Sequence, residues 1–146
     1  MKNKKLLLII VITAIIVLFA VSFIYFKSSA GKTIAVMDKE EYGANEDGRV
    51  KIKSSLSGEI CFSSCYPFYF EKETNGNWEG IAYDKCEEDD LSEKCFDGNK
   101  VKAFRFVFPD LKAGNYRLAI PVCDNCKEGD KFLSNKWIYS NIFKIN

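Results

Sequence analysis

The sequence contains no histidine among its 146 residues, and it carries almost no net charge. Histidine is the commonest general base and a frequent zinc ligand. Its absence therefore excludes Ser-His-Asp and Cys-His catalysis and any metal site built on imidazole. The formal charge of +1 argues against a basic nucleic-acid-binding module. The length allows one domain of ordinary size.

One long hydrophobic run lies near the amino terminus. Residues 6–26 include 19 apolar residues and no charged one. At about 1.5 Å per residue, a helix of this length would span about 31 Å, enough to cross a bilayer. A cleaved signal peptide is the alternative, because Ser28-Ser29-Ala30 resembles a cleavage site. The length of the run favours an uncleaved signal anchor, and the absence of a nearby cysteine excludes a lipoprotein anchor.

The flanks of this run predict its orientation. Lys2, Lys4 and Lys5 precede it and favour a cytoplasmic amino terminus. All six cysteines follow it, and an even set is typical of domains outside the cytoplasm, where disulfides persist. The sequence therefore predicts a single-pass protein of the cell membrane. Its parts are a cytoplasmic tail (1–5), a transmembrane anchor (6–26), a stalk with a possible first strand (27–48) and an extracytoplasmic domain (49–146).

The rest of the chain consists of short segments of alternating polarity, with no sustained helical period. Period-two alternation is typical of strands that bury one face, and Asn75-Gly76-Asn77 supplies a hairpin turn. The expected strands are Thr33–Met37, Val50–Leu56, Phe68–Glu71, Trp78–Tyr83, Val101–Phe108, Tyr116–Val122 and Trp137–Ile145. In the last of these, Tyr139 and Phe143 should share a face, and Asp38–Gly48 should form a loop. This pattern predicts an all-β antiparallel sandwich of about seven strands.

Short motifs fit these positions. Tyr116 follows the turn at Gly114, as in a tyrosine corner, in which the hydroxyl bonds back to the backbone. From about Val50 to Ile145 the chain resembles bacterial immunoglobulin-like (Ig-like) domains. The resemblance is carried by Phe70-Glu71-Lys72, Asn75-Gly76-Asn77-Trp78, Ala113-Gly114-Asn115-Tyr116-Arg117 and Tyr139–Ile145. It implies a surface or extracytoplasmic module without catalysis or cofactor. The extra cysteines and a long acidic loop depart from that family.

Strand antiparallelism places all six cysteines, in three loops, at one end of the sandwich. Fifteen disulfide pairings are conceivable. The sequence-local set is the working hypothesis: Cys61–Cys65, Cys86–Cys95 and Cys123–Cys126. A bond from the loop of Cys61 to the loop of Cys123 is its rival. A zinc site of Cys61, Cys65, Cys123 and Cys126 is a further alternative, since C-x₃-C and C-x₂-C spacings suit tetrahedral thiolate ligation.

The segment Cys123-Asp124-Asn125-Cys126 also has the C-x-x-C spacing of thiol-disulfide oxidoreductases. In those proteins the first cysteine begins a helix, which lowers its pKa. Here the turn-like stretch Lys127–Asp130 follows the motif, and no tryptophan precedes it. The sequence therefore argues against redox catalysis.

Two groups of side chains are candidates for recognising a partner. The acidic ones could form a solvated loop, bind calcium or dock a basic partner, although the EF-hand order is absent. The aromatic ones could form an exposed patch or pack locally against the disulfides. The candidate interaction residues are Tyr66, Tyr69, Glu87, Glu88, Asp89, Asp90, Phe132 and Trp137.

The sequence thus favours a membrane-anchored, non-catalytic Ig-like module that binds or adheres. Its cysteine-stapled loop end would be presented to a protein or surface-polymer partner, with no metal, cofactor or nucleic acid. A structural envelope component, or a subunit of a surface assembly, is the alternative. A thiol-disulfide redox protein is a minor one. Exposure of the loop end distinguishes the first two classes.

Overall fold

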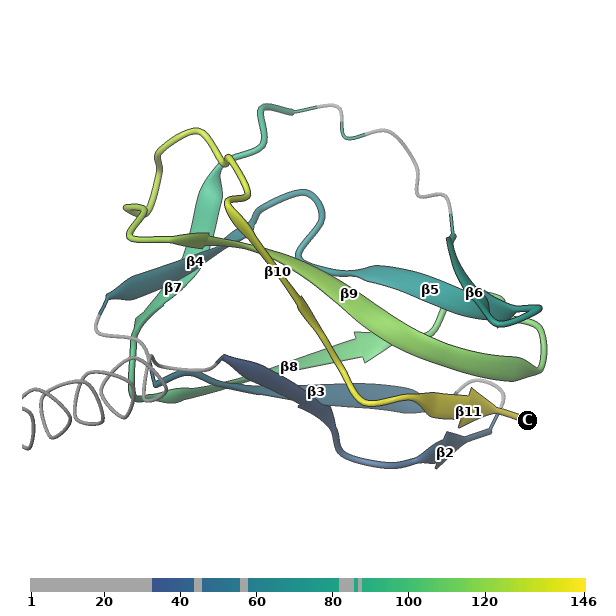
Figure 1. The fold of residues 1–146 in the computed structure, drawn as a ribbon. Coiled ribbons are helices and arrows are strands. Elements are labelled where there is room, and N and C mark those ends of the chain that lie inside the picture. Colours follow the sequence, from purple (N-terminus) through teal and green to yellow (C-terminus); the bar gives the residue numbers. More distant parts are fainter. Residues whose placement is uncertain (1–32, 44–45, 56–57, 82–85, 87) are drawn as a thin grey trace, which may run out of the picture. The chain divides into compact units, whose positions relative to one another are not determined.

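A computed structural model describes residues 33–43, 46–55, 58–81, 86 and 88–146 (Figure 1). The chain divides into two units, Met1–Gly31 and Lys32–Asn146, of which only the second is described. The predicted cytoplasmic tail and anchor lie outside the described residues, as does the stalk up to residue 32. Within the ranges given above, no helix is long and apolar enough to cross a membrane.

The smaller of two sheets contains three antiparallel strands in the order β1-β3-β8. The strands span Ile34–Met37 (β1), Asp47–Lys53 (β3) and Val101–Val107 (β8). Side chains alternate along β3, so Val50 and Ile52 are fully buried while Lys51 is exposed. Each strand therefore has one face toward the core and one toward solvent.

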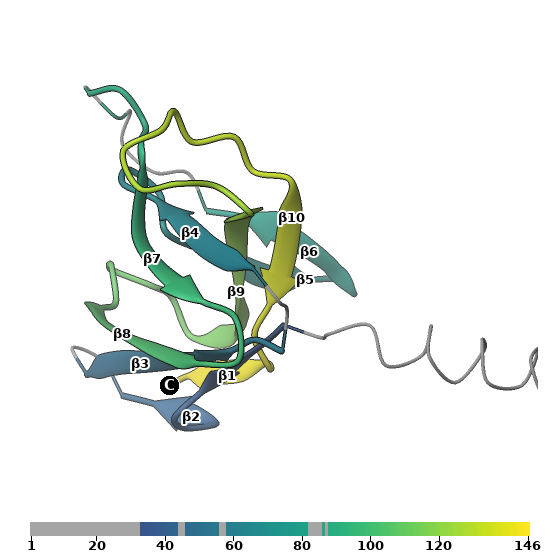
Figure 2. The same ribbon diagram turned by 90° about the vertical axis from the view of Figure 1, so that its left-hand side faces the viewer.

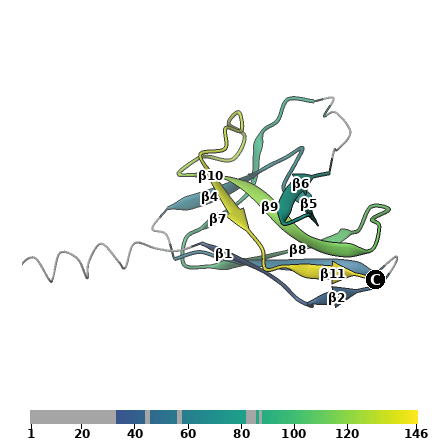
Figure 3. The same cartoon turned by 45° about the vertical axis from the view of Figure 1, so that its right-hand side comes forward.

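The larger sheet is built around β9 (Gly114–Asp124), which pairs with strands on both sides. On one side lie β4 (Glu59–Ser63) and β5 (Tyr69–Thr74), and on the other β10 (Lys136–Tyr139) and β11 (Phe143–Ile145). Farther out, β7 (Ser92–Asp97) pairs with β4, β6 (Asn77–Gly80) pairs with β5, and β2 (Glu41–Tyr42) runs parallel to β11. Seen from the end that carries β4 and β7, β3 and β8 form one layer, and β4, β9 and β10 the other (Figure 2). Figure 3 shows the same two layers from another side.

Aromatic rings from both sheets fill the core. The ring centroid of Phe62 on β4 lies 4.8 Å from that of Phe104 on β8, and Phe70 on β5 lies 5.6 Å from Phe106. Phe104, Phe106 and Phe108 all pack against the core. All three rings are only partly buried: Phe104 and Phe106 lie on the edge strand β8, and Phe108 directly follows it.

The hairpin between β5 and β6 has the turn that the sequence predicts. Asn75 and Gly76 adopt φ angles of 52° and 78°, a region that Asn tolerates and Gly adopts freely. The turn brings Thr74 opposite Asn77.

The distribution of strands over the two sheets is that of the Ig fold. In that fold strands A, B and E share one sheet, and C, F and G the other. Here β1, β3 and β8 share one sheet, in the places of A, B and E. The other sheet holds β4 and β5 in the place of C, β9 in the place of F, and β10 with β11 in the place of G. The Tyr116 ring is buried, and its hydroxyl donates a hydrogen bond to the carbonyl of Lys112 at 2.5 Å. This is the contact that defines a tyrosine corner.

Three strands lie in segments that the sequence pattern assigns to loops. In β4, Ile60, Cys61 and Phe62 are all fully buried, so no polar alternation marks the strand. In β7, a β-bulge with Lys94 at a φ of 53° breaks the alternation. The short β2 lies within Asp38–Gly48.

The last predicted strand, Trp137–Ile145, is two strands. Between them, Ser140 Oγ accepts a hydrogen bond from a β9 amide at 2.9 Å, and Asn141 Oδ1 accepts one from a β1 amide at 2.7 Å. This interruption shifts the alternation, so Tyr139 is exposed while Phe143 is buried. The expectation that these two residues share a face is wrong.

Candidate functional site

The six cysteines form three disulfides: Cys61–Cys95, Cys65–Cys86 and Cys123–Cys126. The sequence-local pairing agrees with the structure for Cys123–Cys126 and is wrong for the other four cysteines. The reason lies in the strands that the sequence pattern does not show. Because β4 and β7 are paired, the Cα atoms of Cys61 and Cys95 lie only 4.0 Å apart.

The disulfides gather at one end of the larger sheet, the arrangement that strand antiparallelism predicts. Cys61 and Cys123 are directly opposite on β4 and β9, and Cys61 Sγ lies 3.3 Å from the carbonyl oxygen of Cys126. The zinc alternative requires four free thiolates, but its cysteines are distributed over three disulfides. The redox alternative requires a helix after Cys123. Instead, Asn125 adopts a φ of 63° in a turn.

Asp90 in the acidic loop has a structural role. Its Oδ1 accepts a hydrogen bond from Ser63 Oγ at 2.6 Å and one from the Cys65 amide at 3.3 Å. The carboxylate therefore holds the turn after β4, and it is not a freely available interaction group. Glu88 and Asp89 are exposed, and Glu87 lies outside the described residues.

The acidic loop is also bonded to the loop between β9 and β10. Leu91 forms an antiparallel bridge with Lys131, and the Phe132 amide donates to the carbonyl of Asp90 at 2.8 Å. Only 9% of Phe132 is exposed. These backbone bonds hold Phe132 in a packed position, so little of its ring is available to a partner.

Three other candidate residues meet on the outer surface of the larger sheet. The rings of Tyr66 and Tyr69 are stacked with centroids 5.6 Å apart, and Tyr69 lies 5.8 Å from Trp137. Tyr69 and Trp137 belong to β5 and β10, which flank β9. Burial, with a smaller contribution from Tyr66, raises the pKa of the Tyr69 hydroxyl, which therefore stays a hydrogen-bond donor.

A second row of side chains crosses the same surface. The guanidinium carbon of Arg117 on β9 lies 4.4 Å from the ring centroid of Trp78 and 4.2 Å from that of Tyr139. Its Nε donates to Glu71 Oε2 on β5 at 2.6 Å. Cation–π attraction and the ion pair together fix the plane of the guanidinium. None of these four residues is among the sequence candidates. The signal for them is alternation, which places Arg117 opposite Glu71.

Small side chains of β9 lie between the large ones. Ala119 is opposite both Tyr69 and Tyr139, and Pro121 is opposite Trp137. Trp137 and Tyr139 remain 49% and 47% exposed. We call Tyr69, Trp78, Arg117, Trp137 and Tyr139 the aromatic face. It contains both tryptophans of the chain.

No family model matches the sequence, and no curated protein matches it. Among solved structures, the chain is similar to the CARDB domain of a Pyrococcus furiosus protein, crystallised in complex with di-metal ions. The identity is 11%, the match covers 80% of this chain and 90% of that one, and the TM-score is 0.39. A sporulation control protein from Bacillus subtilis has 11% identity, with 80% of this chain and 49% of that chain covered and a TM-score of 0.37. At these TM-scores, the fold assignment depends on the strand pairing alone.

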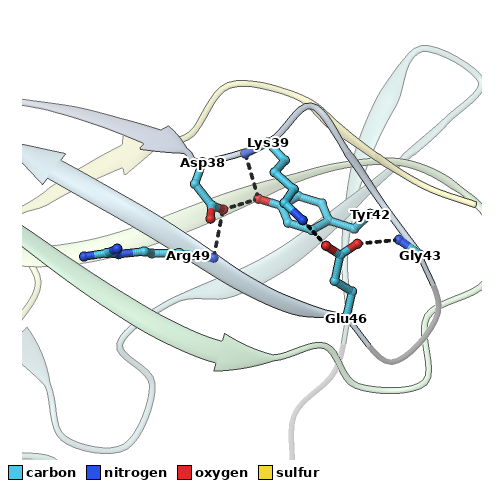
Figure 4. A network of polar contacts seen from close by, with 6 residues as sticks. All are labelled: Asp38, Lys39, Tyr42, Gly43, Glu46 and Arg49. Carbon is cyan, nitrogen blue, oxygen red and sulfur yellow. Dashed lines mark hydrogen bonds and ion pairs between the residues drawn. The ribbon is translucent and has the colours of Figure 1, made fainter.

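A separate polar network joins β1, β2 and β3 (Figure 4). Asp38 Oδ1 accepts hydrogen bonds from the Tyr42 hydroxyl at 2.6 Å and from the Arg49 amide at 3.1 Å. Burial acts to raise the pKa of Asp38, but these hydrogen bonds outweigh it, and the pKa is lowered. Burial first, and then the bond to Asp38, raises the pKa of Tyr42. The role of this network is structural, because its hydrogen bonds connect the residue after β1 with β2 and β3.

Glu46 extends this network. It is ion-paired with Lys39 and accepts a hydrogen bond from the Gly43 amide at 3.0 Å (Figure 4). Beside the network is an open polar recess of about 230 Å³. The recess is lined by Asp38, Lys39, Asp47, Gly48, Arg49 and Arg105.

Proposed function

We propose that the protein is a membrane-anchored, extracytoplasmic binding module without catalytic activity, and that its aromatic face binds a surface polysaccharide. The anchor predicted at residues 6–26 supports the membrane location. The three disulfides support a domain in an oxidising compartment.

The observation that carries the proposal is the pair of half-exposed rings of Trp137 and Tyr139 beside the ion pair of Arg117 and Glu71. Tyrosine and tryptophan offer flat apolar surfaces, which suit the C–H faces of sugar rings. The guanidinium and the carboxylate offer donors and acceptors to sugar hydroxyls. Because the side chains already hold one another in place, ordering them on binding costs little.

This surface replaces the loop end as the binding site. The acidic loop and the loop after β9 are bonded to each other, and Asp90 is engaged in a turn. The aromatic face continues from the disulfide cluster along β9, since Cys123, Pro121 and Ala119 follow one another on its outer side.

Tryptophan fluorescence of the full chain in detergent micelles tests the polysaccharide. Both tryptophans lie on the aromatic face, so titration with soluble peptidoglycan fragments and chitin oligosaccharides should change the emission. Trp137→Ala should weaken binding by about tenfold or more, with Trp78 still reporting. Ile142→Ala is the matched control, because Ile142 is 53% exposed and lies outside the face. Unchanged emission with every saccharide, or equal affinity of Trp137→Ala and the wild type, would contradict the proposal.

The membrane location has its own test. The full chain should remain in the membrane pellet after carbonate extraction of cells that express it. An alkylating reagent that does not cross the membrane should modify the cysteines only after reduction. Release into the carbonate supernatant, or cysteines that are freely alkylated without reductant, would contradict the predicted anchor or compartment.

A further inference from the structure

The outer surface of the smaller sheet is basic. Arg49, Lys51 and Lys53 occupy outward positions of β3, and Arg105 occupies one of β8. We call these four residues the basic face. Within the part of the chain that the structure describes, none of them has a carboxylate at ion-pair distance. Two acidic residues, Asp38 and Asp47, lie at the end of this surface and line the polar recess together with Arg49 and Arg105.

Two cations of the basic face are directly opposite. Arg49 and Arg105 are register partners on β3 and β8. Like charges at such positions destabilise a sheet when nothing neutralises them. The guanidinium of Arg49 points away from Asp38 (Figure 4). The Asp38 carboxylate instead accepts a hydrogen bond from the backbone amide of Arg49. The pair is therefore suited to an anion from outside the chain.

Exposed aliphatic side chains flank these cations on both sides. Ile34 and Val36 on β1 are 39% and 45% exposed, and Val101 and Val107 on β8 are 59% and 70% exposed. One row across the sheet reads Ile34, Lys53, Val101. Cations between apolar side chains suit the headgroup layer of a bilayer, where lysine and arginine stems lie along apolar surface. A soluble polyanion would make no use of the apolar flanks.

The basic face is also close in sequence to the predicted anchor. Seven residues, 27–33, separate Phe26 from Ile34 at the start of β1. Even fully extended, the eight residue steps from Phe26 to Ile34 span at most about 29 Å. The first residue of β1, Ile34, is therefore tethered by the chain within that distance of Phe26, the last residue of the predicted anchor.

We infer that the basic face binds anionic phospholipid headgroups of the membrane in which the chain is anchored. The inference takes the anchor from the proposed function, and it does not depend on the polysaccharide. The aromatic face belongs to the opposite sheet of the sandwich. Headgroup binding by the smaller sheet would therefore leave the aromatic face directed away from the bilayer.

Lipid quenching of a new tryptophan tests this inference. The full chain carrying Val101→Trp is placed in nanodiscs of phosphatidylcholine, with or without an equal share of phosphatidylglycerol, and a nitroxide-headgroup lipid serves as quencher. The extra emission relative to the wild type should be quenched in phosphatidylglycerol discs and little in phosphatidylcholine discs. Salt should abolish the difference, because the screening length falls from about 10 Å at 0.1 M to about 3 Å at 1 M.

Removal of charge gives the matched comparison. Each cation near an anionic surface contributes roughly fivefold to binding, so Lys51→Gln with Lys53→Gln should weaken headgroup binding by roughly 25-fold and remove the quenching. Lys127→Gln with Lys131→Gln, two exposed loop lysines, should not. Equal quenching in both kinds of disc, or quenching that survives the Lys51 and Lys53 substitutions, overturns the inference.

Two further outcomes separate the proposals. Binding of soluble polyphosphate that depends on Lys51 and Lys53, without lipid-dependent quenching, would assign the basic face to a soluble polyanion and overturn its assignment to the bilayer. Failure of the chain to co-purify with phosphatidylcholine discs would contradict the anchor. Sedimentation with phosphatidylglycerol vesicles then tests the basic face alone, and sedimentation that does not depend on Lys51 and Lys53 overturns the inference.

Discussion

The disulfide between Cys65 and Cys86 should stabilise the domain more than the one between Cys123 and Cys126. The two bonds close loops with sequence separations of 21 and 3. The loss of chain entropy in the unfolded state then gives about 3.4 kcal/mol for the first and about 1.9 kcal/mol for the second. Of these four cysteines, Cys123 is buried and the other three are only partly buried. Replacing them by alanine therefore leaves little cavity, and the loss of each disulfide changes stability mainly through the unfolded state.

Urea unfolding of the paired alanine variants measures this difference. Cys65→Ala with Cys86→Ala should lose about 1.5 kcal/mol more unfolding free energy than Cys123→Ala with Cys126→Ala. A thiol count on the denatured, unreduced protein should give no free thiol in either variant. Under the sequence-local pairing, the first variant would instead release the thiols of Cys61 and Cys95. Two free thiols, or a reversed order of stability, would refute the reasoning.

Three further predictions concern single residues. Tyr116→Phe should cost about 0.5–1.5 kcal/mol in urea unfolding, because the hydrogen bond to the Lys112 carbonyl is lost, while Tyr139→Phe should cost almost nothing; equal losses would contradict the tyrosine corner. Gly48→Ala should cost about 1–3 kcal/mol, because a Cβ there would approach a ring of β8 to 2.5 Å, whereas Gly80→Ala meets no atom within 4 Å; equal melting temperatures would contradict this packing. The pKa of Asp38 is lowered in the folded state, so its contribution to stability is complete above the unfolded pKa and is lost as pH falls through the folded one. Asp38→Asn should therefore lose less stability than the wild type between about pH 5 and pH 2, and parallel pH profiles in thermal melts would contradict this.

The strands that the sequence predicts are those that bury one face. β3 and β8 alternate regularly, and the hairpin at Asn75-Gly76 is explicit in the turn residues. β4 is hidden because both of its faces are covered, one by the core and one by the disulfide of Cys61. β7 is hidden because its bulge at Lys94 interrupts the period. The disulfide pairing could not be found while these two adjacent strands were missing.

The candidate site was predictable only in part, for a similar reason. The contact of Tyr66, Tyr69 and Trp137 follows from strand order, and it is present in the structure. Arg117 can be recognised as part of the site only from the strand register, which places it opposite Glu71 on β5. Alternation marks Arg49, Lys51 and Lys53 in the sequence, but the repulsion between opposite arginines appears only when β8 is paired with β3.

The parallel pairing of β2 with β11 has a consequence for how the domain folds. It joins Glu41 with Lys144, from opposite ends of the described chain, and β11 also completes the pairing of β9. Contacts between such distant positions close late and slow folding, because a long loop must be ordered first. If the domain crosses a membrane behind the predicted anchor, β1 emerges before β11, and these pairings are lacking until Phe143–Ile145 has emerged. The cysteines would then reach an oxidising compartment before the strands that bring them together have paired. Correct disulfide formation would therefore depend on thiol–disulfide exchange during folding.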